Sequence, residues 1–326
     1  MIDTASIFNI SNEQEFEDLA LQIFKFQFQN NKVYRAFCDL LYIHPSDVNS
    51  IKDIPFLPIE FFKTKTIVSS KNQIQTTFTS SGTTGDNTSK HHVTDLNLYI
   101  KSFTKGFKHF YGNIEDYVIL GLLPSYLERQ GSSLIYMVDT MIKTSKHDES
   151  GFYLNNLSTL KDTLVKLDAK GKKTLLIGVS FALLDLVEAH SFNLNHTIIM
   201  ETGGMKGRRK ELIRTELHHI LKTEFGVNHI HSEYGMTELL SQAYSKGEGL
   251  FECPPWMNVL TRDPEDALSI QDTNTTGGLN IIDLANINSC SFIATQDLGK
   301  SYKNGLFEVI GRFDNSDIRG CNLMVF

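Results

Sequence analysis

A short segment rich in hydroxyl side chains and glycine could bind the phosphates of a nucleotide. Residues 76–85 read TTFTSSGTTG and begin in a β-like stretch. Glycine lets the backbone approach phosphate oxygens closely, while backbone N–H groups and Ser or Thr hydroxyls supply hydrogen-bond donors. The segment is not a GxxxxGK[ST] loop, because no Lys follows Gly85 directly. A flexible surface loop is the alternative, since the same composition is typical of one.

Acidic residues follow short apolar segments at two further places. The motif YGMTE, residues 234–238, comes after an apolar segment at 227–231 that could be a strand. Ligands bind at the carboxyl ends of strands in α/β sheets, so Glu238 could hold Mg²⁺, which prefers oxygen ligands. In TQDLG, residues 295–299, Asp297 could accept hydrogen bonds from two ribose hydroxyls. Taken alone, Glu238 fits better as a solvated acid at a helix start.

Charged and histidine-rich segments provide weaker candidates. GRFDNSDIRG, residues 311–320, places Arg312 in a glycine-bounded turn that is ordinarily a solvated loop. Basic residues at 206–210 are interpreted as a solvated helix face. The histidines at 91–92, 218–219 and 229–231 lack the cysteine or acid that would complete a standard metal spacing, so we interpret them as surface or core residues.

Alternating strands and helices are expected to position these candidates. Short apolar runs predict strands over 117–123, 173–178 and 196–201. Longer periodic segments predict the helices between them, over about 130–143, 155–168, 181–190 and 206–225. Gly226 follows the last of these where a C-terminal glycine belongs. This alternation favours an α/β fold with a parallel or mixed sheet covered by helices on both faces.

The two ends of the chain read differently from this middle part. Residues 12–45 carry apolar spacing that suits a helical lead-in, and glycines from residue 258 onward punctuate short β-type runs. We therefore expect an α/β core over residues 1–257 that includes the helical lead-in. A smaller β-rich subdomain is expected over residues 258–326.

Composition limits the classes of partner and compartment. The chain has 326 residues, 41% of them hydrophobic, with 31 Lys plus Arg against 38 Asp plus Glu. The resulting charge of −7 gives no global basic field for nucleic acid or an anionic membrane. The apolar stretches at 117–127 and 174–184 are too short to span a membrane, and the N-terminus lacks signal-peptide order. Four cysteines without CxxC spacing fit a reducing cytoplasm.

The order of these motifs resembles that of the adenylate-forming superfamily. That order is a TSGTTG-like phosphate loop, a GG turn, a YGxTE block, an Asp after a short strand and a GRxDxxxxRG segment. The sequence is most similar to the acyl-protein synthetases of bacterial luminescence, the LuxE type. The matching segments are IPFLPIEFFK, FTSSGTTG, LIGVS, ETGGMK, CPPWMNVLTRDPE, TQDLG and RGCNL. The resemblance implies the N-terminal domain of an adenylate-forming enzyme, with mixed and parallel sheets layered with helices.

The resemblance also implies roles for individual residues of an ATP site. Around the phosphates it places Thr79, Ser80, Ser81, Gly82, Thr83, Thr84 and Gly85. By the adenine it places Gly203 and Gly204, with Tyr234 stacking nearby and Gly235 beside it. Glu238 would hold Mg²⁺ and be catalytic together with Thr237, Asp297 would bind the ribose, and Arg312 would contact ribose or phosphate. Two departures are expected: Lys90 is a displaced substitute for the usual phosphate-loop lysine, and the usual C-terminal lid domain is missing.

The resulting prediction is an acid–thiol ligase that uses ATP and Mg²⁺. It would activate a carboxylic acid, by resemblance a fatty acid, as acyl-AMP. It would then transfer the acyl group to Cys321 in RGCNL, as a thioester for delivery to an acyl reductase or another acceptor protein. One alternative is an acyl-CoA or acyl-carrier-protein ligase. The other is a non-catalytic nucleotide-binding subunit.

Overall fold

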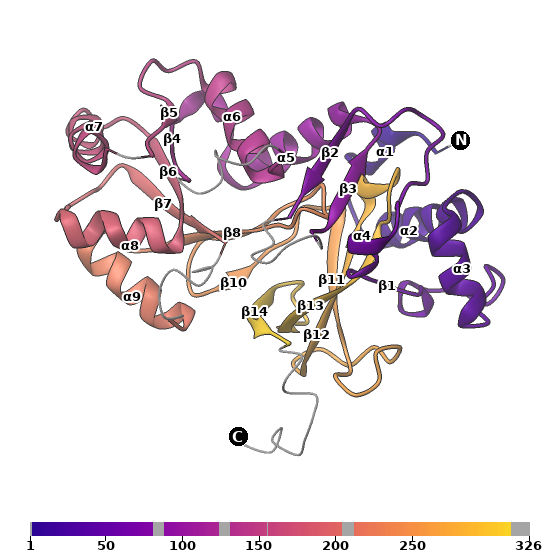
Figure 1. Cartoon of the computed structure of the whole chain (residues 1–326). Coiled ribbons are helices and arrows are strands. Elements are labelled where there is room, and N and C mark those ends of the chain that lie inside the picture. Colours follow the sequence, from indigo (N-terminus) through magenta and orange to yellow (C-terminus); the bar gives the residue numbers. More distant parts are fainter. Residues whose placement is uncertain (1, 81–87, 124–130, 155, 204–211, 314–326) are drawn as a thin grey trace. The chain divides into compact units, whose positions relative to one another are not determined.

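The chain packs into two compact units, and each is described by itself. The computed structural model describes residues 2–80, 88–123, 131–154, 156–203 and 212–313 (Figure 1). One unit is residues 72–254, and the other combines residues 1–71 with residues 255–326. This division differs from the expected core over residues 1–257, because residues 1–71 pack with the C-terminal segment.

The unit of residues 72–254 contains a mostly parallel sheet with the strand order β5-β4-β6-β7-β8-β9. All residues of β4 and β6 are buried, as is typical of a parallel sheet covered on both faces. Only β9 is antiparallel to its neighbour. The strands are β4 (Val118–Leu122), β5 (Gly151–Phe152), β6 (Thr174–Val179), β7 (Thr197–Thr202), β8 (His231–Tyr234) and β9 (Ala243–Ser245).

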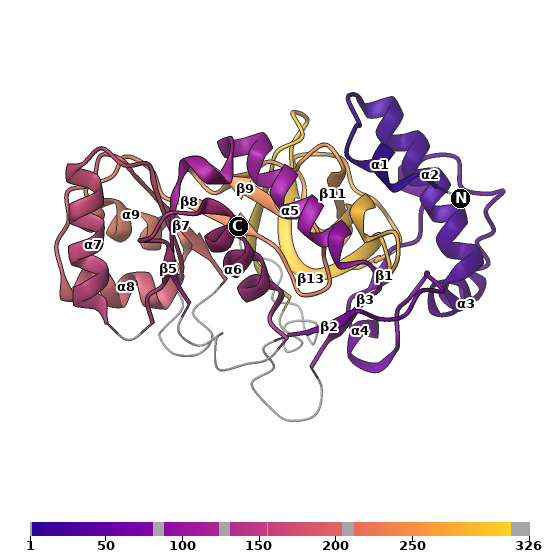
Figure 2. The same cartoon turned by 90° about the horizontal axis from the view of Figure 1, so that it is seen from above.

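Helices cover the two faces of this sheet. The helices α7, α8 and α9 lie on one side, and α5 and α6 lie together on the other (Figures 1 and 2). The helices are α5 (Leu96–Tyr111), α6 (Ser133–Ser145), α7 (Leu157–Ala169), α8 (Ser180–Ala189) and α9 (Arg214–Phe225), with a short 3-10 turn η2 (Ile114–Asp116). A separate hairpin is formed by β2 (Thr76–Thr79) and β3 (Lys90–Val93), and β10 (Leu250–Phe251) follows β9.

The last helix of this unit begins later than its pattern predicts. Of the predicted helix over 206–225, residues 206–211 lie outside the described residues. In the described part, Ile213 has an extended backbone and α9 begins at Arg214, so the prediction is wrong for residues 212 and 213. Gly226 ends the helix with φ +68°, the left-handed conformation that glycine adopts most readily.

The other unit contains an antiparallel sheet in the order β14-β13-β12-β11, with β1 parallel to β13. The strands are β1 (Leu57–Pro58), β11 (Met257–Arg262), β12 (Thr276–Asp283), β13 (Phe292–Ser301) and β14 (Phe307–Arg312). The helical elements are α1 (Thr4–Ile7), α2 (Glu13–Asn30), α3 (Lys32–Leu40), α4 (Phe61–Thr64), η1 (Ile51–Asp53) and η3 (Leu284–Asn286).

Buried polar side chains explain why the N-terminal helices pack with this sheet. Gln27 of α2 is fully buried, and its amide nitrogen donates to the backbone oxygens of Asn286 and Ile287. Asn31 donates to the carbonyl of Ser289. The Phe292 ring packs against aromatic rings of α2 and α3. These contacts span more than 250 positions of sequence, so the local pattern of residues 12–45 does not reveal them.

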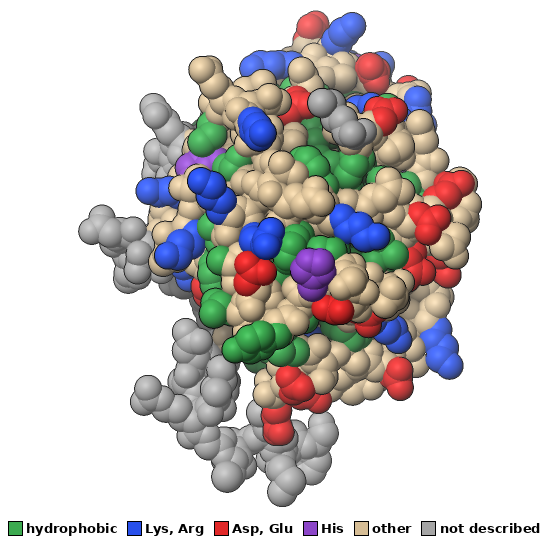
Figure 3. Space-filling model, turned by 90° about the vertical axis from the view of Figure 1, so that its right-hand side faces the viewer, with side chains coloured by type: hydrophobic (Ala, Val, Ile, Leu, Met, Phe, Trp, Pro, Cys, Tyr) green, Lys and Arg blue, Asp and Glu red, His purple; other side chains and the backbone are tan. Residues whose placement is uncertain are grey.

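Two surface properties follow from the described residues. Among them, no helix combines the length and the apolar character that a membrane span requires. On the face shown in Figure 3, acidic and basic side chains are interspersed among polar and apolar ones.

Candidate functional site

The β2–β3 hairpin carries the two described residues of the predicted phosphate loop. Thr79 ends β2 and lies opposite Lys90 of β3. Its N–H donates to the carbonyl of Gly131. Ser80 exchanges two hydrogen bonds with Ser89: its N–H donates to the Ser89 carbonyl, and its hydroxyl accepts from the Ser89 N–H at 3.0 Å. These bonds fix both ends of the segment between Ser80 and Ser89, while Ser81, Gly82, Thr83, Thr84 and Gly85 lie outside the described residues.

A buried histidine joins this hairpin to the YGMTE turn. His91 of β3 is 1% exposed, and its Nδ1 lies 2.8 Å from the carbonyl oxygen of Thr237. Because a carbonyl can only accept, Nδ1 carries the proton. Glu238, the next residue, is also buried. Alternating exposure along residues 90–93 places His91 on the inner face of β3, but its partner lies 146 positions away, so the local pattern does not indicate this contact.

The turn itself starts at the carboxyl end of β8. Tyr234 is the last residue of that strand, is 9% exposed, and its ring centroid lies 5.8 Å from that of Phe251. Gly235 follows, and a Cβ at this position would lie 2.5 Å from Oε1 of Glu233. A side chain would therefore displace the buried Glu233 carboxyl, which explains the need for glycine here.

Gly203 begins the turn after the neighbouring strand β7. It has φ +68°, and its carbonyl accepts a hydrogen bond of 2.9 Å from the Ser180 hydroxyl. Gly204 lies outside the described residues. The expected candidates Gly203, Tyr234, Gly235, Thr237 and Glu238 thus come from the carboxyl ends of adjacent parallel strands or the turns after them, where α/β sheets bind ligands.

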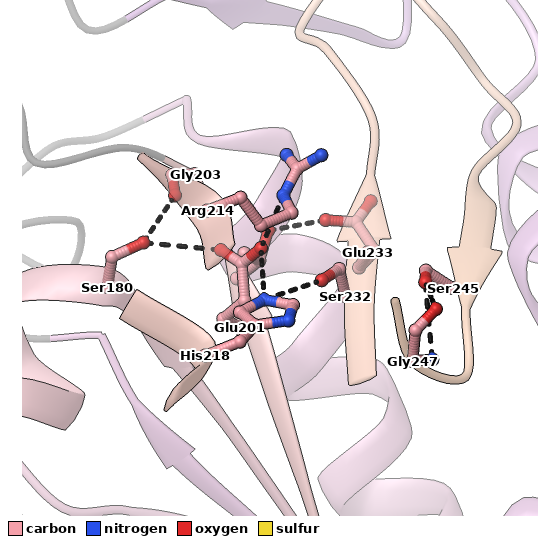
Figure 4. A network of polar contacts seen from close by, with 10 residues as sticks. Ser180, Glu201, Gly203, Arg214, His218, Ser232, Glu233, Ser245 and Gly247 are labelled. Atoms are coloured by element: carbon pink, nitrogen blue, oxygen red, sulfur yellow. Dashed lines mark hydrogen bonds and ion pairs between the residues drawn. The ribbon is translucent and has the colours of Figure 1, made fainter. Parts of the chain in front are cut away.

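A buried network of polar side chains lies beneath this edge of the sheet (Figure 4). The Glu201 carboxylate accepts a 3.2 Å hydrogen bond from the Ser180 hydroxyl. Its other oxygen lies 3.6 Å from Nε of Arg214 and 3.6 Å from Nε2 of His218. Burial raises the pKa of Glu201, but the His218 hydrogen bond and the Arg214 charge outweigh it, so the pKa is lowered overall. Glu201 is therefore ionised at neutral pH.

Glu233, on the next strand, has a raised pKa, whereas the pKa of Glu201 is lowered. Thr202 of β7 is paired with Glu233 of β8, and its hydroxyl donates to the Glu233 carboxyl. Burial raises the pKa of Glu233 to about 7; the Thr202 hydrogen bond opposes this rise, and the negative charge of Glu201 adds to it. Glu233 is consequently half protonated near neutral pH. Neither Glu201 nor Glu233 was among the sequence candidates.

The candidate ribose residues lie in the other unit. Asp297 of β13 is 7% exposed and is paired across the sheet with Arg312 of β14. Nε of Arg312 lies 3.3 Å from Oδ1 of Asp297, and the Arg312 side chain is 70% exposed. The adjacent Gln296 donates to the Glu60 carboxylate. Asp297 therefore has a defined position, whereas most of Arg312 faces solvent.

Two of the described cysteines are poor acceptor thiols. Cys38 and Cys290 are free and buried. Burial raises the pKa of both Cys38 and Cys290 to about 12, so neither forms a thiolate at neutral pH. Cys253 is partly exposed. Cys321, the predicted acceptor, lies outside the described residues.

Candidate metal ligands do not cluster among the described side chains. Within this part of the chain, no group of three or more His, Cys, Asp or Glu residues is arranged to hold a metal ion. Burial lowers the pKa of His231 to about 4, and His229 and Lys246 add to this effect. The Glu238 carboxylate, in the turn after β8, is an oxygen donor of the type that Mg²⁺ prefers.

Comparison with known proteins supplies the family context. Residues 2–326 match the family described as "Acyl-protein synthetase, LuxE". A long-chain-fatty-acid–luciferin-component ligase of Vibrio harveyi is 24% identical over 330 residues, covering 92% of this chain and 84% of that protein. Its namesake from Aliivibrio fischeri is 24% identical over 347 residues, covering 97% and 89%. The resemblance drawn from the motifs is confirmed.

Solved structures confirm the predicted fold. An open conformation of 2-hydroxyisobutyryl-CoA ligase superposes with a TM-score of 0.64 at 11% identity, covering 93% of this chain and 70% of that one. ATP-bound MatB from Rhodopseudomonas palustris gives a TM-score of 0.56 at 17% identity, covering 74% of this chain and 49% of MatB. The chain thus spans about half the length of this neighbour.

Proposed function

Because this chain belongs to the acyl-protein synthetase (LuxE) family, we propose that it uses ATP and Mg²⁺ to activate a long-chain fatty acid. The acyl group then passes to the Cys321 thiol and onward to an acyl reductase or another acceptor protein. The match over residues 2–326 carries this proposal, since it includes the phosphate-loop, YGMTE, TQDLG and RGCNL segments together. The free, buried thiols of Cys38 and Cys290 suit a reducing cytoplasm.

The nucleotide would be held by residues from several motifs. We assign the phosphates to the segment from Thr79 to Gly85, with Lys90 beside it. The adenine is assigned to Gly203, Gly204, Tyr234 and Gly235. The ribose is assigned to Asp297 and Arg312. The hydrogen bond from His91 to Thr237 supports the first of these assignments, because it ties the phosphate-loop hairpin to the YGMTE turn.

Glu238 would hold the metal ion. It is a buried carboxylate next to Thr237, and an all-oxygen donor set fits a hard cation. When bound, Mg²⁺ would neutralise charge on the phosphates. The family's usual lysine has no counterpart directly after Gly85, so hydroxyl and backbone donors have a larger share in binding the phosphates.

The first half-reaction forms a mixed anhydride. A carboxylate oxygen of the fatty acid attacks the α-phosphorus of ATP, the α–β bridging bond breaks, and pyrophosphate leaves. Donors of the phosphate loop hold the phosphates in line with the attacking oxygen and take up the developing negative charge. The product, acyl-AMP, has a good leaving group in place of the carboxylate oxygen.

The second half-reaction forms a thioester. The Cys321 thiolate attacks the acyl carbonyl carbon, the bond to the phosphate oxygen breaks, and AMP leaves. An ordinary cysteine thiol has a pKa of about 8.5, so transfer is expected to accelerate as the pH rises toward that value. The thioester keeps enough reactivity for delivery to a reductase.

The test separates the two half-reactions. The full chain is incubated with Mg²⁺, ATP and radiolabelled tetradecanoic acid, and label on the protein and pyrophosphate exchange are both measured. Wild type should retain label that hydroxylamine releases. Cys321→Ser should keep exchange but lose this label, whereas Glu238→Gln should lose exchange at least tenfold. Cys253→Ser is the matched control and should behave as wild type.

Each other result points to a different function. Hydroxylamine-labile label that persists on Cys321→Ser would contradict the acceptor assignment. Release of acyl-CoA on addition of coenzyme A, without protein-bound label, would identify an acyl-CoA ligase. Absence of exchange with fatty, aromatic and amino acids would leave a nucleotide-binding subunit without this activity.

A further inference from the structure

The antiparallel sheet has a bulge at the residues that present Asp297. Along β12 and β13, Gly278 is opposite Leu298, but the next aligned pair is Asn280 with Ala294. Leu279 therefore faces three residues, 295–297. A bulge of this kind interrupts the ladder of hydrogen bonds and leaves backbone groups unpaired, and it redirects side chains. The carbonyl groups at this bulge need other donors, because they are buried.

Arg262, from the TRDPE segment, supplies those donors. Its side chain extends from the end of β11, and the residue is 9% exposed. Nη1 donates to the Leu279 carbonyl at 2.9 Å and to Oδ1 of Asn280 at 2.9 Å, and Nη2 donates to the Thr295 carbonyl. The planar guanidinium thus bridges the two strands across the bulge, with one nitrogen directed at each.

The sheet is shaped to admit this guanidinium. Gly278 lies opposite Arg262 in the β11–β12 pair, and a Cβ on Gly278 would lie 2.4 Å from Cζ of Arg262. Thr295 continues the connection: its hydroxyl donates to the Leu279 carbonyl at 2.8 Å and accepts from the N–H of Asp297 at 3.1 Å. A continuous set of hydrogen bonds therefore runs from Arg262 to the backbone of Asp297.

We propose that Arg262 is a positioning residue that fixes the bulge so that Asp297 presents its carboxylate to the ribose hydroxyls. This inference rests on the role of Asp297 in the proposed function. Arg312 differs from Arg262 because it contacts the Asp297 carboxylate directly and is mostly exposed. Arg262 interacts with Asp297 through its charge and through the backbone hydrogen bonds at the bulge, so loss of the guanidinium should change how well the protein recognises ribose and leave phosphate recognition intact.

The experiment measures ribose recognition by binding. Dissociation constants for ATP, 2′-deoxy-ATP and 3′-deoxy-ATP are determined by calorimetry with the full chain. Asp297→Asn removes the carboxylate charge, and its loss of preference for ATP over the two deoxy nucleotides is the reference for the other variants. We expect wild type to prefer ATP at least tenfold, and Arg262→Lys to lower this preference at least threefold, because an ammonium cannot span both strands.

A second variant and a control separate positioning from folding. Gly278→Ala displaces the guanidinium without removing its charge and should lower the preference similarly. Tyr34→Phe, on α3, removes a buried 2.6 Å hydrogen bond from the Tyr34 hydroxyl to the Pro55 carbonyl, outside the strands that form the bulge. It should lower the melting temperature but keep the preference of wild type. A merely structural role would reduce binding of all three nucleotides equally.

The outcomes decide between this inference and the proposed function. A wild-type preference in both Arg262→Lys and Gly278→Ala overturns the positioning role, as does an unchanged preference in Asp297→Asn. Pyrophosphate exchange is measured on the same samples. Nucleotide preference without any exchange would contradict the proposed reaction while supporting the role of Arg262, and absence of ATP binding by wild type would contradict both.

Discussion

In the parallel sheet of residues 72–254 two buried carboxyl groups lie near the ends of adjacent strands, whereas in the antiparallel sheet of the other unit a buried guanidinium lies at a bulge. Glu201 and Glu233 lie on adjacent strands, β7 and β8. Arg262 lies at a bulge between β12 and β13 and is surrounded by carbonyl oxygens. The edge of the parallel sheet therefore brings negative charges together, whereas the bulge in the antiparallel sheet leaves carbonyl oxygens that need a positively charged donor.

Parallel strands bring their carboxyl ends to one edge, so acids that end successive strands become neighbours. Two like charges at such an edge cannot both be ionised without compensation. Here Glu201 is compensated by Arg214 and His218, while burial keeps the Glu233 proton bound up to a pH of about 7. A bulge instead frees carbonyl groups, and one planar cation satisfies several of them at once.

The largest expected effect tests the protonation of Glu233. Its pKa of about 7 lies above the ordinary value of 4.5, so the folded state binds the proton more tightly than the unfolded state. Its contribution to the free energy of unfolding is present below pH 4.5 and declines as the pH rises to about 7. Glu233→Gln stays neutral, so at pH 8 it should exceed wild type by roughly 3 kcal/mol.

Urea unfolding of wild type and Glu233→Gln at pH 5 and pH 8 measures this difference. The variant should exceed wild type by roughly 1 kcal/mol at pH 5 and by roughly 3 kcal/mol at pH 8. Glu216→Gln, in the exposed part of α9, is the control and should show no such change between the two pH values. A variant less stable than wild type at pH 8 would mean that the folded state favours ionised Glu233.

The next largest effect is expected at Glu201, whose negative charge is balanced by Arg214 and His218. Glu201→Gln removes the charge that Arg214 and His218 face, and should lower the free energy of unfolding at pH 7 by about 2 kcal/mol. The loss stays below that of a fully buried pair because the Arg214 side chain is 30% exposed and can be hydrated. The pKa of Glu201 is lowered, so its contribution is present above the ordinary value of 4.5 and is lost as the pH falls below it.

The gap between Glu201→Gln and wild type should therefore shrink below pH 4.5 in urea titrations. The same variant should lower the pKa of Glu233, because the negative charge of Glu201 contributes to raising it. An unchanged pH dependence above pH 5 would show that the two carboxyl groups do not interact.

The sequence pattern predicted the parallel sheet better than its surroundings. Apolar runs in β4, β6 and β7 are local signals, because a strand buried on both faces needs apolar residues throughout. The packing of α2 with the C-terminal sheet depends on Gln27, a polar residue whose partners lie near residue 287. A polar residue on a helix gives no sequence signal that it will be buried.

The sequence pattern likewise identified only part of the candidate site. Motif spacing predicted Thr237 and Glu238, and the described residues of these motifs do follow strands. His91, Glu201 and Arg262 went unrecognised because each acts through a partner that is distant in sequence or through the backbone. The roles assigned to the site residues, including Cys321 and the loop from Ser81 to Gly85, remain predictions.

The smallest stability effect is expected at Arg312, which sharpens the contrast with the buried Arg262. Its ion pair with Asp297 is 3.3 Å long, but its side chain is 70% exposed, so solvent screens the interaction. Arg312→Met should change the free energy of unfolding by only about 0.5 kcal/mol. If Arg312 contacts the ribose or phosphate as proposed, the dissociation constant for ATP should nevertheless rise about tenfold, equivalent to about 1.4 kcal/mol. Lys300→Met makes the same change of charge at a second partly exposed pair, with Glu308, and should leave ATP binding unaltered. If both variants bound ATP equally weakly, Arg312 would act only through the net charge of the sheet.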